Sequence, residues 1–276
     1  MKRVFVLMAL SAAMAGCAIS TQQEVQMGQS YASQLNSQLP VVNDPVVEQY
    51  INQLGDSIAR LTGRGDLDWH FFVVNTDVVN AFALPGGFIY VNRGIIERAD
   101  KLDELAGVMG HEIGHVVKRH SVKQMQQQQG ANIGVALTCV LTHVCDSQAS
   151  QAAIQVGGAA VFASFSRQDE KEADEEGFKN VVRAGISPRG METFFQKLLS
   201  EEKGGDSPVN AWFSDHPLTQ DRIADIQGLI SKTDPAILRT LTEDSRAFQA
   251  FKDRVHALPP GPKPRQQPQQ QQQQAP

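Results

Sequence analysis

The sequence predicts an α+β fold that is mostly helical and contains a small β-sheet. Two observations predict helices: residues 102–117 carry apolar side chains at spacings of three and four, and residues 46–61 show a second apolar face. A third observation predicts the sheet, because residues 69–74 and 88–91 are short aromatic and β-branched runs. The 276 residues are enough for one domain with its own core, and the net charge of −5 without a basic stripe argues against a nucleic-acid partner.

The N-terminus has the pattern of a secretory signal. Lys2 and Arg3 precede an apolar run that is too short to span a bilayer, which needs about 20 residues. Residues 14–17 resemble a lipobox, so we expect residues 1–16 to be a lipoprotein signal peptide and Cys17 to be lipidated. The alternative is an ordinary signal peptide with a chance cysteine. Ala18 resembles outer-membrane sorting, which predicts a lipid-anchored protein on the periplasmic face of the outer membrane.

Next along the chain come a tether and helix (17–42), then a helix with a clear start. Asn43-Asp44-Pro45 is a typical N-terminal signal, and Thr62-Gly63 ends the apolar face. Pro85-Gly86-Gly87 predicts a turn before the second strand.

The helix over 102–117 carries the segment His111–His115, which reads His-Glu-Ile-Gly-His. Residues four apart differ by about 40° in azimuth, so both imidazoles project from one side of the helix, as two ligands of a tetrahedral zinc must. Glu112 is placed to reach a water on that metal as a general base. The alternative is a surface helix that carries two histidines by chance, but the histidines lie opposite the apolar stripe and three glycines (107, 110 and 114) flank them. We therefore expect another backbone to approach closely there.

A third ligand is expected from a second helix. Ser166 is a candidate N-cap before an acidic run, in which Glu170 and Asp174 are four residues apart and share a face. One carboxylate can bind metal while the other accepts a hydrogen bond from a ligand imidazole. The alternative is a solvated acidic face.

Residues 131–165 form an apolar insert that contains Cys139 and Cys145. A disulfide between these cysteines is favoured in an oxidising compartment and requires a turn between them. The alternatives are two buried thiols or a minor metal site with His143.

These motifs together resemble a known family. Residues 80–87 (Asn-Ala-Phe-Ala-Leu-Pro-Gly-Gly), His111–His115 and 166–174 are similar to the HtpX/CAAX-prenyl-protease type of metallopeptidase, closest in layout to its BepA- and LoiP-like periplasmic lipoproteins. The resemblance implies a gluzincin-like metalloprotease domain over 43–257, with one zinc ion held by His111, His115 and Glu170. It also implies Asp174 as the partner of a ligand imidazole.

The resemblance extends to a loop and a strand. Ser214–Pro217 precedes a helix for which Pro217 suits the first position, and alone His216 would be read as a surface residue. The family pattern implies that His216 occupies the open zinc position and gates the site, and that Arg222 either stabilises an oxyanion or ties down the loop. It further implies an edge strand beside the cleft that pairs with substrate backbone, formed by Phe88, Ile89, Tyr90 and Val91.

Three histidines, His70, His120 and His256, have no motif around them and are predicted to be structural or surface residues. Residues 258–276 are rich in proline and glutamine and are predicted to be disordered. The sequence thus predicts a zinc endopeptidase that degrades misfolded or stalled envelope proteins. The alternatives are a non-proteolytic envelope chaperone or assembly factor with a structural zinc, and a peptidase of membrane-protein segments.

Overall fold

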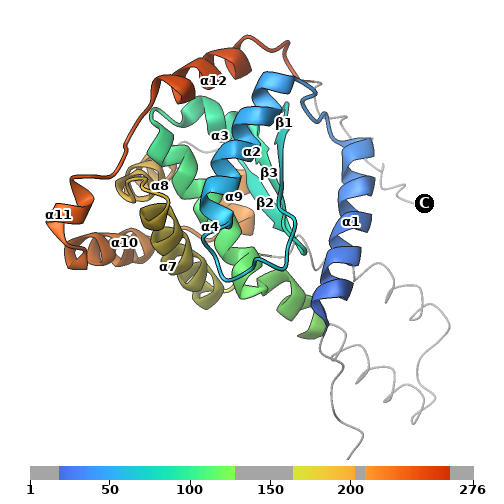
Figure 1. The fold of residues 1–276 in the computed structure, drawn as a ribbon, viewed down its shortest axis with the longest axis horizontal. Coiled ribbons are helices and arrows are strands. Elements are labelled where there is room, and N and C mark those ends of the chain that lie inside the picture. Colours follow the sequence, from blue (N-terminus) through green and yellow to red (C-terminus); the bar gives the residue numbers. More distant parts are fainter. Residues whose placement is uncertain (1–18, 128–163, 203–208, 262–276) are drawn as a thin grey trace, which may run out of the picture.

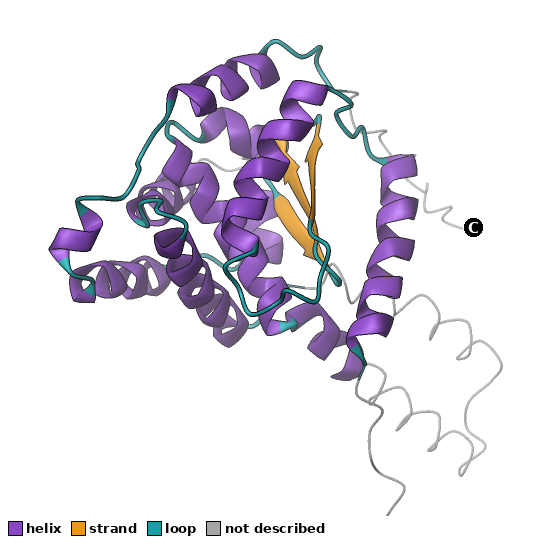
Figure 2. Ribbon diagram, in the orientation of Figure 1, coloured by secondary structure: helices purple, strands orange, loops and turns teal. Residues whose placement is uncertain are grey.

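The computed structural model describes residues 19–127, 164–202 and 209–261, and within them it confirms a mostly helical fold with one small sheet (Figure 1, Figure 2). The elements are α1 (Thr21–Gln38), α2 (Pro45–Ala59), β1 (His70–Val74), β2 (Ala81–Leu84), β3 (Phe88–Asn92), α3 (Arg93–Arg98), α4 (Leu102–Lys118), α7 (Arg167–Arg183), α8 (Arg189–Glu202), α9 (Asn210–Asp215), α10 (Gln220–Lys232), α11 (Pro235–Leu238) and α12 (Arg246–His256). Among the described helices, none contains an apolar stretch of the length that a bilayer crossing requires. Cys17, Cys139 and Cys145 and nearly all of the 131–165 insert lie outside the described residues, so the predictions made for them stay predictions.

The two helix starts predicted from capping residues are confirmed. The Asp44 side chain accepts hydrogen bonds from two backbone N–H groups at the start of α2, and Pro45 stands at its first position. Ser166 and Asp169 form a capping box at the start of α7. The prediction that Pro217 starts a helix is wrong, because α10 begins at Gln220 with Thr219 as its N-cap. A threonine that bonds a backbone N–H satisfies a donor at this end, whereas Pro217 contributes only its ring geometry.

The sheet has the order β1-β3-β2, with β3 parallel to β1 and antiparallel to β2. The prediction that Phe88, Ile89, Tyr90 and Val91 form an edge strand is therefore wrong: β3 is the central strand. All five β3 residues are buried, as expected for a strand covered on both faces. In the described chain, β2 (81–84) is an edge strand of this sheet. The sequence did not predict it, because four residues give little alternation to detect.

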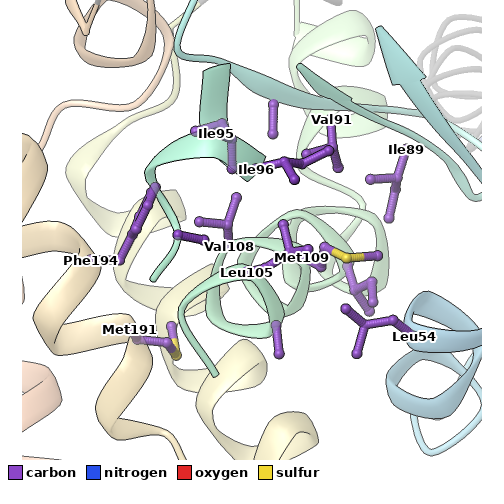
Figure 3. Packing of buried hydrophobic residues seen from close by; sticks show 14 of the residues in the cluster. Leu54, Ile89, Val91, Ile95, Ile96, Leu105, Val108, Met109, Met191 and Phe194 are labelled. Atoms are coloured by element: carbon purple, nitrogen blue, oxygen red, sulfur yellow. The ribbon is translucent and has the colours of Figure 1, made fainter. Parts of the chain in front are cut away.

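The sheet lies between α1 on one face and α4 on the other (Figure 1). Phe88 and Tyr90 of β3 belong to the cluster with α1, whereas Ile89 and Val91 belong to the main core. Figure 3 shows that core, in which α4 is surrounded by side chains from α2, β3, α3 and α8. Residues 102–116 of α4 are all buried, so this helix is the central element of the fold and supports the site from within.

Candidate metal centre

The two predicted ligand helices, α4 and α7, are in backbone contact. A Cβ added at Gly110 would lie 3.3 Å from the Gly177 carbonyl oxygen, and one at Gly114 would lie 2.5 Å from that of Ala173. A Cβ at Gly107 would lie 2.6 Å from the Met191 side chain of α8. The close approach inferred from the glycines is therefore present, and it brings the histidines of α4 and the acidic residues of α7 to one place.

Four buried side chains converge there: His111, His115, Glu170 and His216. Each offers one ligand atom, and these atoms lie within 4.8 Å of one another. The His111 and His115 Nε2 atoms are 3.0 Å apart, and Glu170 carboxylate oxygens lie 3.4 Å from the first and 3.3 Å from the second. The His216 Nδ1 atom lies 3.3 Å from His111 Nε2 and 3.1 Å from Glu170 Oε1.

This donor set fits a tetrahedral zinc ion. Zinc–nitrogen bonds of about 2.0–2.1 Å give a tetrahedron whose edges are about 3.3 Å long, which is close to the spacings between these nitrogen and oxygen atoms. Nitrogen and carboxylate donors are also the chemistry that zinc prefers. The geometry thus places the three predicted ligands together and adds His216 as a fourth donor.

Glu112 is fully buried, and neither of its carboxylate oxygens has a hydrogen-bond partner. Its Oε1 atom lies 3.5 Å from His216 Nε2, so the carboxylate is beside the donor cluster but is not part of it. Burial raises the pKa of Glu112 above its ordinary value. A buried carboxylate without partners is costly unless a ligand, ion or reactant supplies them, so Glu112 is a candidate for a reactive group.

Asp174 and Arg222 stabilise the other side of the cluster. Asp174 Oδ1 lies 2.8 Å from His111 Nδ1, and Arg222 donates from Nε and Nη2 to the two Asp174 oxygens at 2.7 Å. Arg222 also donates to Glu170 and to the Pro217 carbonyl. Of the two roles considered for Arg222, its contacts support tying down the loop after His216.

The protonation of this cluster is uneven. Burial opposes charge on His111, but the carboxylates of Glu170 and Asp174 raise its pKa to about 9. Burial holds the pKa of His115 well below its ordinary value. Although burial favours the neutral acid, the charges of His216 and His111 keep the pKa of Glu170 well below its usual range. The carboxylates of Glu112 and Glu170 both lie against the His216 ring, and their pKa values are thus shifted in opposite directions.

Trp212, Phe165 and His120 contact the site and were not predicted from the sequence to do so. Trp212 lies in the unpredicted helix α9, whose C-cap is the predicted residue His216, and it stacks on the His216 ring with centroids 4.7 Å apart. Phe165 stacks on His115 at 4.0 Å. His120, predicted to be structural or at the surface, is fully buried, and its Nδ1 lies 2.9 Å from His115 Nδ1. No periodicity could reveal this contact, because Arg119 adopts a left-handed conformation and breaks the helix between the two histidines.

The fold and the site together define a metallopeptidase-type domain: two packed helices present a His-Glu-x-x-His segment and a distant glutamate around one cluster. The chain belongs to peptidase family M48, whose profile matches residues 45–230.

Relatives of known name support this assignment. The beta-barrel assembly-enhancing protease of Escherichia coli K12 is 35% identical over 233 residues, which cover 82% of this chain and 47% of that protein. The metalloprotease LoiP of the same organism is 33% identical over 153 residues, covering 55% of this chain and 59% of LoiP. The mitochondrial metalloendopeptidase OMA1 of Schizosaccharomyces pombe is 30% identical over 178 residues, covering 64% of this chain and 51% of OMA1. The chain spans about half the length of the first of these relatives.

Proposed function

We propose that this protein is a zinc-dependent endopeptidase of unfolded or misfolded envelope proteins, anchored to the outer membrane through a lipid on Cys17. The observation that carries the peptidase assignment is the buried, unpartnered Glu112 carboxylate beside four converging donors. The substrate class rests on the similarity to a beta-barrel assembly-enhancing protease, and the address rests on the N-terminal sequence pattern.

The residues of the chain divide the chemistry between them. His111, His115 and Glu170 would hold the ion, which when bound supplies Lewis acidity to polarise a scissile carbonyl and to acidify water. Glu112 accepts the proton of the attacking water and passes it to the leaving amine nitrogen. Its raised pKa suits both steps, because a carboxylate with a pKa nearer neutrality both takes up and releases a proton readily.

The substrate approaches next to β2. Asn80, which precedes β2, donates to the Asp215 carboxylate at 2.9 Å, and Asp215 precedes His216. The start of the edge strand is therefore tied to the metal cluster. An extended chain added along β2 would be held by backbone hydrogen bonds, with little demand on its sequence.

A second candidate function is favoured by one observation. With His216, the cluster contains four protein donors, and a complete set of four protein ligands is typical of structural zinc. A non-proteolytic chaperone that keeps zinc for stability would show this arrangement.

The two functions are separated by Glu112→Gln, which keeps the shape of the side chain but not its basicity. We expect the wild type to degrade casein and Glu112→Gln to do so at least about 100-fold more slowly at equal zinc content, since general-base catalysis contributes about 10²–10⁴-fold. Equal degradation by the two proteins would favour the chaperone. So would the absence of degradation both by the wild type and by a His216→Ala variant, in which the site is opened.

A further inference from the structure

His120 is a buried polar side chain at the metal cluster that the mechanism above does not use. Arg119 ends α4 with φ 58° and turns the chain sharply, so that His120 begins a new helical segment over 120–127. The turn brings the His120 ring edge-on to His115, with ring centroids 5.0 Å apart and an interplanar angle of 75°. The side chain is completely buried.

The two rings meet through one specific pair of atoms. His115 directs Nε2 at the donor cluster, 3.0 Å from His111 Nε2, so its Nδ1 faces away and lies 2.9 Å from His120 Nδ1. Two imidazole nitrogens form a hydrogen bond only when one carries a proton and the other does not. A metal on Nε2 leaves the proton of His115 on Nδ1, and His120 must then accept at its own Nδ1.

The other side of His120 agrees with this assignment. A neutral ring that accepts at Nδ1 carries its proton on Nε2. That nitrogen lies 3.4 Å from Glu172 Oε2 and 3.5 Å from Asp169 Oδ1, and both of these atoms are hydrogen-bond acceptors. The sequence of contacts from the cluster outward is therefore imidazole, imidazole, carboxylate, with a donor meeting an acceptor at each junction.

We propose that His120 is a positioning residue that fixes the tautomer and the ring orientation of His115, as Asp174 does for His111. The inference rests on the metal site of the proposed function. A neutral acceptor suits this position because the cluster already contains the carboxylates of Glu112, Glu170 and Asp174 with the single guanidinium of Arg222. Another carboxylate against His115 would add a buried negative charge without a cation to match it.

The competing explanation is that His120 only fills space. Two variants with the same number and branching of side-chain heavy atoms separate the explanations. His120→Asn places an amide near the position of Nδ1 and can accept the His115 proton, whereas His120→Leu offers no acceptor. Zinc affinity of the full chain is measured by competition with a chromogenic chelator, and thermal unfolding of the metal-free proteins controls for folding. We expect His120→Leu to bind zinc about 10–100-fold more weakly than the wild type, and His120→Asn to recover most of that loss.

Equal zinc affinity of the two variants, or tighter binding by His120→Leu, would overturn the inference while leaving the proposed function intact. A wild type that binds no zinc would overturn both. Nitrogen-15 NMR of the histidine rings in the zinc-loaded wild type needs no variant to fold: we expect a proton on Nδ1 of His115 and on Nε2 of His120. A proton on Nδ1 of His120 would reject the assignment.

Discussion

The two groups of carboxylates at the metal cluster are buried alike but are partnered in opposite ways. All four oxygens of Glu170 and Asp174 have partners, supplied by His111, His216 and Arg222. Both oxygens of Glu112 have none. The pKa of Glu170 is lowered and that of Glu112 is raised. The difference supports the proposal that one region holds the geometry of the cluster, whereas the other keeps a base available for a reactant.

The largest effect should come from removing charge on the partnered side. Glu170→Gln preserves the size of the side chain but removes an anionic ligand, so we expect loss of zinc and of hydrolysis together. The fall in zinc affinity should exceed the about 100-fold typical for losing an outer partner of a ligand. Metal content after dialysis measures it, with Glu112→Gln as the matched control that retains zinc. Stoichiometric zinc in Glu170→Gln would show that the glutamate is not a ligand.

Next in size is the effect of Arg222→Met on folding. The substitution leaves Glu170 and Asp174 buried without their cation, which costs about 3–5 kcal/mol of unfolding free energy. Urea denaturation of the metal-free proteins measures this loss. The comparison predicts that Glu112→Gln has no such cost, because it removes a charge that has no partner. Similar stability of Arg222→Met and the wild type would remove the distinction between the two regions.

The parts of this site that were predictable from the sequence are the residues that lie together in one segment with helical periodicity. His111, Glu112 and His115 share one helix, and the three glycines predicted a close backbone approach, which α7 makes at Gly110 and Gly114 and α8 makes at Gly107. The family resemblance, rather than spacing, identified Glu170 as the predicted third ligand. β2 and α9 were missed because each is four to six residues long, too short for a period to show. The His120–His115 contact depends on a left-handed Arg119, which no side-chain pattern encodes.

Another buried carboxylate, Asp103, tests whether missing partners alone make a catalytic group. It lies in the first turn of α4, its Oδ1 has no hydrogen-bond partner, and burial raises its pKa to about 7. Below the pKa of Asp103 in the unfolded chain, near 4, the carboxyl is protonated in both states and its burial carries no charge. As pH rises from there through about 7, the buried carboxyl must ionise, and the folded protein loses stability. Asp103→Asn should therefore match the wild type near pH 4 and be more stable by about 2–4 kcal/mol above pH 7.

Urea titrations of Asp103→Asn and the wild type at several pH values measure this difference, with casein hydrolysis as the functional control. Asp103 lies about 12 Å from His111 along the helix, so we expect zinc content and hydrolysis at pH 7 to be unchanged. Lost hydrolysis in a folded, zinc-loaded Asp103→Asn would mean that the contrast between Glu112 and the partnered carboxylates does not identify the base.

The smallest effect concerns His216, which stands between the two regions. Its Nδ1 lies among the ligand atoms and its Nε2 faces Glu112, so the ring lies between the cluster and the carboxylate that we propose as the base. His216→Ala opens that space, and we expect hydrolysis of an unfolded protein to rise about 10-fold, equivalent to removing a gate worth about 1.4 kcal/mol. His256→Ala, whose side chain is 81% exposed, is the control. Unchanged or lower turnover with zinc retained would argue against gating. The rise in hydrolysis must also vanish in the double variant with Glu112→Gln, because the opened site still depends on that carboxylate.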